Sequence, residues 1–175
     1  DVALSFGFMQ FWRLKEDWLR LTAKYFGHRY LFDCIVPGGV AEDISDSGKT
    51  EFAVAADRIE AEVRELKAIF HDQSTLPDPF SNTGFCKPDL AGRLGLTGLP
   101  GRASAQAWDA RVQFPQAPYD QLNVNMATNR RGDVLARAEV RFAEVAESLR
   151  LIRDILKRLP AGEIHAPVNS VHNVC

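Results

Sequence analysis

The chain has 175 residues, of which 46% are apolar and 25% charged, with 21 basic against 23 acidic side chains. That length suits one domain with its own hydrophobic core, and the composition excludes a disordered chain. A net charge of −2 argues against nucleic acid as a partner, because no excess of lysine and arginine is available to neutralise phosphates. No apolar run reaches the roughly 18 residues of a membrane-spanning helix, and no secretory signal is visible. We therefore expect a cytoplasmic protein with no membrane span of its own.

The first predicted element is a helix over residues 1–26. Apolar side chains recur there at steps of three and four residues, which places them on one face of a helix. Gly27 follows, and it can end the helix in the left-handed conformation that glycine adopts at little cost. The apolar stripe comprises Leu4, Phe8, Phe11, Leu14, Trp18, Leu21 and Tyr25.

Residues 27–48 are rich in turn-forming residues. The apolar residues 34–36 before Pro37 predict a short strand or extended piece. Gly38 and Gly39 can cradle a phosphate or form a tight turn. The chain lacks the glycine-rich nucleotide-binding motifs, which favours the turn. 

His28 and Arg29 come directly after the first helix. They can face an anion, or they can form an exposed cationic helix end that interacts with the helix dipole. The sequence leaves both interpretations open.

A second helix is predicted over residues 49–71. Thr50 is a plausible N-cap, and Glu60 and Arg64 stand four residues apart in the order that favours an ion pair. The apolar face carries Phe52, Ala55, Ile59, Val63, Leu66 and Phe70.

The third predicted helix covers residues 133–159 and has an unbroken heptad seam. Asp133 can cap its start, and Pro160 stops it. A free coiled coil would explain the seam, but two other amphipathic helices in the chain favour a bundle. The seam runs through Leu135, Ala138, Phe142, Val145, Leu149, Ile152, Leu156 and Leu159.

The connection over residues 73–132 is rich in proline and glycine. It is far longer than the usual loop of about 4–6 residues, so we expect it to be ordered and functional. Pro88 can open a short helix at its first position. Gly98 and Gly101 can each let backbone approach another group closely.

The candidate site lies in this connection, in the motif Trp108-Asp109-Ala110-Arg111. A carboxylate between Arg102 and Arg111, beside an aromatic ring, can handle a proton whose pKa its neighbours set. The competing interpretation is an Asp–Arg pair that only staples a loop, and the residues alone favour it.

The cysteines indicate no metal site. Cys34, Cys86 and Cys175 are widely spaced, no Cys-x-x-Cys pair exists, and the histidines are not spaced from them as in a zinc or cluster site. We therefore predict free thiols and no metal held by these residues.

Several small motifs in order give the chain a family resemblance. It resembles the large subunit of group 4 nickel–iron hydrogenases, of the formate hydrogenlyase type, and the related 49 kDa subunit of respiratory complex I. The motifs are Gly27-His28-Arg29, Pro37-Gly38-Gly39-Val40, Arg102-Ala103-Ser104, Trp108-Asp109-Ala110-Arg111, Arg131-Gly132-Asp133-Val134 and Leu159-Pro160-Ala161-Gly162.

The resemblance implies a mainly α fold built on a long-helix bundle, with an ordered Pro/Gly-rich connection and little β. It also implies a membrane-associated electron-transfer complex with a small iron–sulfur subunit, through which the chain meets membrane subunits, so we expect a location at the periphery of the cytoplasmic membrane. Hydrogenases bind nickel and iron through two flanking Cys-x-x-Cys pairs, whereas the complex I relatives lose them and bind quinone.

By this resemblance several residues acquire roles. Asp109 handles protons at the cavity, and the same wall includes Arg102, Ser104, Trp108 and Arg111. His28, Arg29, Gly38 and Gly39 shape the backbone near a subunit interface.

Three departures from the family pattern bear on the assignment. Neither flanking ligand pair is present, so we interpret residues 1–175 as a central fragment, inactive alone. Ala105 replaces the usual glycine after Arg-x-Ser. Leu31 stands where complex I subunits carry a histidine, which favours the hydrogenase-like branch. A quinone-reducing parent and a helical interaction module without a redox role remain as alternatives.

Overall fold

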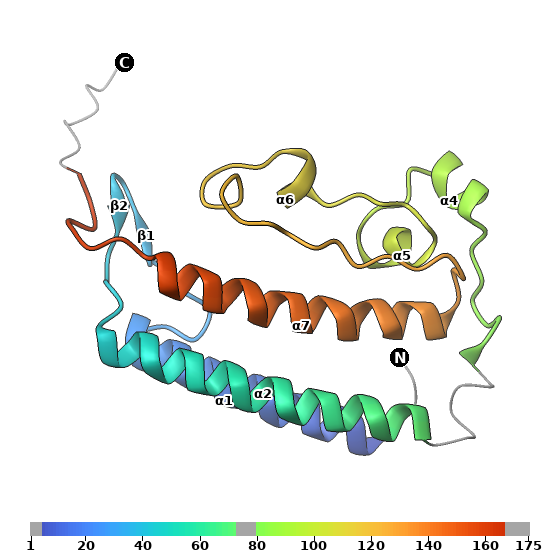
Figure 1. The fold of residues 1–175 in the computed structure, drawn as a ribbon, viewed down its shortest axis with the longest axis horizontal. Coiled ribbons are helices and arrows are strands. Elements are labelled where there is room, and N and C mark those ends of the chain that lie inside the picture. The colour runs from blue at the N-terminus through green and yellow to red at the C-terminus, as the bar shows by residue number, and fades with distance from the viewer. Residues whose placement is uncertain (1–4, 73–79, 167–175) are drawn as a thin grey trace. The chain divides into compact units, whose positions relative to one another are not determined.

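The computed structural model describes residues 5–72 and 80–166, and it is mainly helical (Figure 1). Helix accounts for 59% of the described residues and strand for 3%, which confirms the mainly α fold with little β. Leu4 of the predicted apolar stripe and Cys175, one of the predicted free thiols, lie outside the described residues. The chain divides into two compact units, and it passes from one to the other inside the second helix and again near the end of the last helix, after Ile155.

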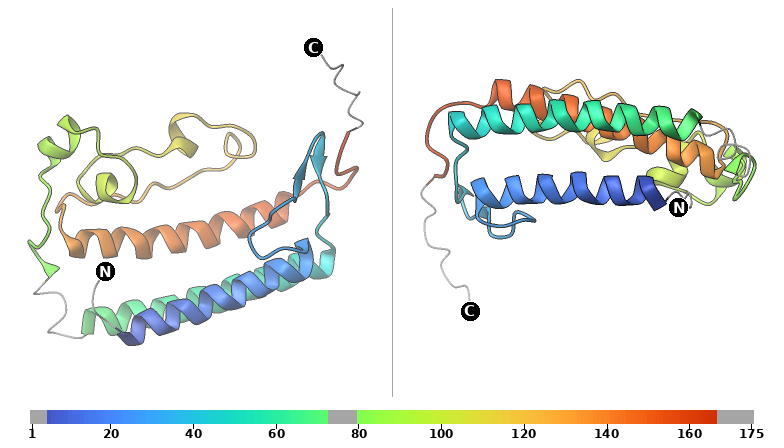
Figure 2. Two further views of the ribbon diagram at one scale, coloured as in Figure 1. Left: turned by 180° about the vertical axis from the view of Figure 1, so that it is seen from behind. Right: turned by 90° about the horizontal axis from the view of Figure 1, so that it is seen from below.

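One unit contains α1 (Ser5–Phe26) and the first part of α2 (Asp46–Asp72), which lie side by side (Figure 2). Phe52 of α2 is 5% exposed and packs against the rings of Trp18 and Tyr25, with centroids 5.3 and 5.7 Å away. Gly27 ends α1 with a φ of +73°, as predicted.

The stripe on α1 is buried over only part of its length. Leu14 is buried, but Phe8 and Phe11 are exposed. Periodicity identifies a helical face, but it does not show how far along the helix a partner extends.

The start of α2 differs from the prediction. The helix begins at Asp46, and the hydroxyl of Ser45 accepts a hydrogen bond from the N–H of Gly48 at 3.1 Å. Ser45 is therefore the N-cap. The prediction of Thr50 is wrong, because its hydroxyl donates to the carbonyl of Asp46 one turn earlier, inside the helix.

The predicted extended piece is a small hairpin of β1 (Ile35–Val36) and β2 (Gly39–Val40). A Cβ on Gly39 would lie 2.2 Å from the carbonyl oxygen of Ile164, so a larger residue has no room. The N–H of Val40 donates to that same carbonyl at 3.1 Å. Gly39 thus permits a close approach, and the partner is the chain's own backbone.

The other unit is built on the second part of α2 and on α7 (Val134–Arg158) as far as Ile155. Asp133 caps α7 as predicted, since its Oδ1 accepts the N–H of Ala136 at 2.7 Å. Phe70 of α2 packs against Phe142 with ring centroids 5.7 Å apart.

The long connection lies along α7 (Figure 1) and is ordered where described, from residue 80 onward. It carries α4 (Pro88–Arg93), which starts at Pro88 as predicted, then α5 (Gly98–Ala103) and α6 (Ala110–Gln113). Ala103 of α5 is fully buried against Ala136 and Val140, so α7 has a second covered face beside its heptad seam.

In the described part of the chain, no helix combines the length and apolar character needed to cross a membrane.

Candidate functional site

Asp109 lies at the N-terminus of α6 and is held by Arg111. Its Oδ1 accepts the backbone N–H and the Nε–H of Arg111, both at 3.0 Å, while Oδ2 accepts Nη2 at 2.7 Å. The carboxylate therefore caps the short helix and pairs with its second residue. Its side chain is only 9% exposed, whereas that of Arg111 is 33% exposed, so the carboxylate is shielded from water more than its partner is.

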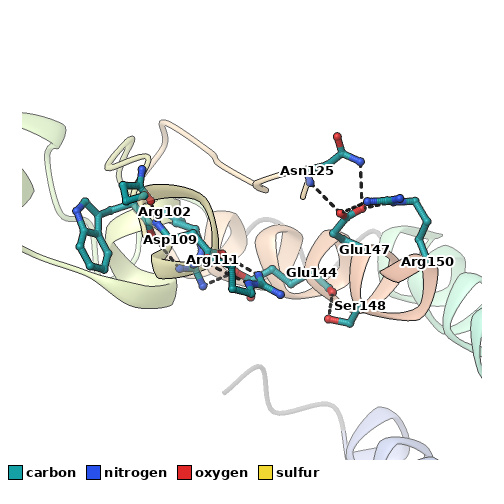
Figure 3. Close-up of polar contacts among 10 residues, drawn as sticks. Arg102, Asp109, Arg111, Asn125, Glu144, Glu147, Ser148 and Arg150 are labelled. Carbon is teal, nitrogen blue, oxygen red and sulfur yellow. Dashed lines mark hydrogen bonds and ion pairs between the residues drawn. The ribbon is translucent and has the colours of Figure 1, made fainter. Parts of the chain in front are cut away.

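Arg102 joins this loop to α7 (Figure 3). Its Nε donates to Oε1 of Glu144 at 2.6 Å, and its Nη1 donates to the carbonyl of Trp108 at 3.3 Å. Both partners of the ion pair are substantially buried. Arg102 thereby links the backbone of Trp108, the residue before Asp109, to the carboxylate of Glu144 on α7.

The charges around Asp109 favour its ionised form. The hydrogen bonds from Arg111 hold the pKa of Asp109 below its usual value, and the positive charge of Arg102 acts in the same direction, while burial opposes both. These contacts therefore stabilise the carboxylate form of Asp109 relative to the protonated form.

Ser104 is next to this group in sequence but makes no polar contact with it. Its side chain is buried, with 1% of the residue exposed, and its Oγ has no hydrogen-bond partner among the described residues. The next residue, Ala105, has a φ of +65°, in the left-handed region that favours glycine.

Trp108 presents an aromatic surface beside the buried carboxylate. It is 43% exposed and packs edge to face against Phe114, with ring centroids 6.0 Å apart. The site thus combines an open aromatic pair with a shielded anion at Asp109.

His28 and Arg29 belong to the other unit. Arg29 pairs with Glu16 at 2.6 Å, and the hydrogen bonds from Arg29 and Arg20 lower the pKa of Glu16 to about 2. The anion that Arg29 faces in this structure is thus one of the chain's own residues. His28 accepts the N–H groups of Tyr30 and Phe32 at Nδ1, which shapes the loop after α1.

The residue that the sequence reasoning missed is Glu144. The heptad seam defines one face of α7, whereas Glu144 lies on the second covered face. A signal for it existed, because Ala136 and Val140 precede it at four-residue steps on that face. A carboxylate that continues such an apolar row indicates a partner of opposite charge.

The described residues offer no ligand set for a metal. They contain no group of three or more His, Cys, Asp or Glu side chains that could hold one. Cys34 and Cys86 are free thiols and belong to different units. A nickel–iron centre, which needs paired cysteines, does not fit the residues described.

Comparison with known proteins gives the family. The family described as respiratory-chain NADH dehydrogenase, 49 Kd subunit, matches residues 1–173. The chain belongs to this family. Among its relatives, NADH-quinone oxidoreductase subunit 4 of Thermus thermophilus is 30% identical over 95% of this chain, and the carbon monoxide-induced hydrogenase of Rhodospirillum rubrum is 31% identical over 91%.

The match covers only part of each relative. The chain spans 41% of the Thermus thermophilus subunit and 44% of the Rhodospirillum rubrum hydrogenase. A solved structure of the membrane-bound sulfane sulfur reductase, an archaeal respiratory membrane complex, superposes with a TM-score of 0.82 at 23% identity, covering 93% of this chain and 44% of that chain. At that identity the likeness bears on the fold alone.

Proposed function

We propose that this chain forms the central helical domain of the large subunit of a membrane-associated, hydrogenase-like electron-transfer complex and is inactive alone. The observation that carries the proposal is the shielded Asp109 carboxylate, held by Arg111, in a chain whose relatives are oxidoreductase subunits. A structural staple needs no burial, whereas proton handling benefits from a carboxylate whose charge is controlled by fixed neighbours.

In this proposal Asp109 is the group that gains and loses a proton. Arg111 keeps it ionised, Arg102 adds positive charge, and Trp108 covers the motif with an exposed aromatic surface. Ser104 supports the same wall from its buried position. The carboxylate takes up a proton when charge changes nearby weaken its attraction to the two arginines.

The runner-up function is a quinone-site-forming subunit of an NADH:quinone oxidoreductase. The names of several relatives, including the one from Thermus thermophilus, support it. Leu31, where the complex I pattern has histidine, supports the hydrogenase-like branch instead. A nickel–iron centre in the full-length protein would require Cys-x-x-Cys pairs outside these residues, so no step of the proposal uses one.

The third hypothesis is a helical interaction module without a redox role. This hypothesis predicts that Asp109 is a solvated surface residue. Asp109 is only 8% exposed, which argues against the interaction-module hypothesis.

The proposed partners are a small iron–sulfur subunit with its cluster and, through it, membrane subunits. The relative from Thermus thermophilus is by its name one subunit of an NADH-quinone oxidoreductase, which supports an assembly of several subunits. The proposed location is the cytoplasmic side of the membrane, at its periphery.

Substitution of Asp109 by asparagine tests the site. Asparagine keeps the shape and can still cap α6, but it cannot hold the charge. In the intact complex we expect turnover to fall at least about tenfold with normal assembly, since a lost general acid or base costs on the order of 100-fold or more. Asp120→Asn, an exposed site in the same connection, is the control. Wild-type turnover in Asp109→Asn would remove Asp109 from the mechanism.

A second measurement separates the two branches. The complex isolated through this subunit is assayed for hydrogen production from a reduced viologen and for quinone reduction. Hydrogen production supports the hydrogenase-like function. Quinone reduction without hydrogen production replaces it with the quinone-type function.

A further inference from the structure

Glu144 on α7 carries no assigned role, yet it is the partner of the arginine beside the site. The contact between Glu144 Oε1 and Arg102 Nε is 2.6 Å, and Arg102 Nη2 also contacts Oε1. Arg102 in turn holds the Trp108 carbonyl, one residue before Asp109. The four charged side chains thus come from α5, α6 with its cap, and α7 (Figure 3).

The signs of these charges set up a competition. Two carboxylates, Asp109 and Glu144, share the field of two guanidinium groups, Arg102 and Arg111. Glu144 takes the direct hydrogen bonds of Arg102, so Asp109 receives that charge only through space. Tyr119 completes the set of titratable groups that act on Arg111.

We propose that Glu144 is a positioning residue which, through Arg102, limits how strongly Asp109 is held as an anion. Without the Glu144 charge, Asp109 would face the full positive charge of two arginines. With it, the group of four is neutral, and Asp109 keeps a protonation equilibrium that the proposed function can use. This inference rests on the proposed function of Asp109.

The two partners of the ion pair provide a test that structural damage cannot imitate. Glu144→Gln and Arg102→Gln break the same contact between α5 and α7. Their electrostatic effects on Asp109 are opposite, because one removes a negative and the other a positive charge. We expect the midpoint of the pH–rate profile of the intact complex to move to lower pH in Glu144→Gln and to higher pH in Arg102→Gln.

Two further variants control this experiment. Glu144→Asp keeps the charge, so its midpoint should return toward the wild-type value. Glu147→Gln lies one turn further on α7 and removes a carboxylate that binds Asn125 and Arg150 instead, so its midpoint should stay at the wild-type value.

The outcomes separate the inference from the proposed function. Shifts of the same sign in Glu144→Gln and Arg102→Gln, or no shift in either, overturn the role of Glu144. They do not affect the proposed function of Asp109, which the turnover of Asp109→Asn tests separately. Wild-type turnover in Asp109→Asn overturns the function of the site. A pH-dependent infrared band of a protonated carboxyl, lost in Asp109→Asn, assigns the midpoint to Asp109.

Discussion

Glu147 on α7 accepts the backbone N–H of Asn125 at 2.8 Å, although 22 residues separate the two. Arg150, one turn along the helix, donates to the same carboxylate at 2.6 Å. The side chain of Glu147 is 10% exposed. This contact fastens the returning segment of the long connection to α7, and it depends on the charge of Glu147.

The first prediction is a pH dependence of stability due to Glu147. The hydrogen bond from Arg150 lowers the pKa of Glu147 from 4.5 to about 2. A carboxyl whose pKa is lower in the folded state stabilises that state above the unfolded pKa, and the contribution is lost as pH falls through the folded value. The window for Glu147 is therefore between about pH 5 and pH 2.

Urea denaturation of the wild-type chain and of Glu147→Gln, followed by far-UV circular dichroism, measures this effect. The difference in free energy of unfolding should be largest above pH 5 and should shrink steadily toward pH 2. A difference that is constant across this range would contradict the assignment.

The second prediction concerns Arg153, which joins α7 to α2. It donates to Asp57 at 2.8 Å and to Glu60 at 2.6 Å, and its side chain is 21% exposed. Arg153→Ala should lower the free energy of unfolding by about 1–2 kcal/mol, because it leaves two carboxylates without their shared partner.

Arg64→Ala is the matched control for Arg153. Arg64 lies 3.8 Å from the same Glu60 but is 77% exposed, so its loss should change the free energy of unfolding by less than about 0.5 kcal/mol. Equal losses in the two variants would show that burial does not decide the strength of these pairs.

Local signals in the sequence predicted much of this fold. The periodic apolar residues identified α2 and α7, Pro88 marked the start of α4, and Gly27 marked the end of α1. Each of these depends on the conformation of a few adjacent residues or on one helical period. The sequence also placed Asp109 beside Arg111, since both belong to one short motif.

Local signals of this kind could not predict contacts between segments that are distant in the sequence. The pairing of Arg102 with Glu144 joins residues 42 apart, and the sequence around either residue does not predict which residue is its partner. The exposure of Phe8, which is 62%, likewise does not follow from its place in the helical period. Tertiary contacts of this kind follow from the complete fold and not from spacing.

The third prediction separates the observed cap of α2 from the expected one. Ser45→Ala should cost about 1 kcal/mol, because the N–H of Gly48 loses its acceptor. Thr50→Ala should change the free energy of unfolding by less than about 0.5 kcal/mol, since alanine is the better helix former and the lost hydroxyl only donated within the helix. Thermal or urea unfolding of both variants checks the order, and a larger loss in Thr50→Ala would restore the cap that the sequence suggested.

The last prediction compares two glycines with almost the same backbone conformation. Gly132 has a φ of +71° and Gly27 a φ of +73°, so alanine is strained at both by about 1–2 kcal/mol. Their surroundings differ. A Cβ on Gly132 would lie 2.1 Å from the carbonyl oxygen of Cys86, whereas one on Gly27 meets nothing within 4 Å.

Gly132→Ala should therefore cost about 2 kcal/mol more than Gly27→Ala, because the backbone at Cys86 has to move. That movement also strains the hydrogen bond from the N–H of Cys86 to the carbonyl of Gly132, 3.0 Å long, which fixes the start of α7 to the long connection. Urea denaturation of the two variants measures the difference. Equal losses would mean that the connection yields at Cys86 without cost, and that its order near the site does not depend on this close approach.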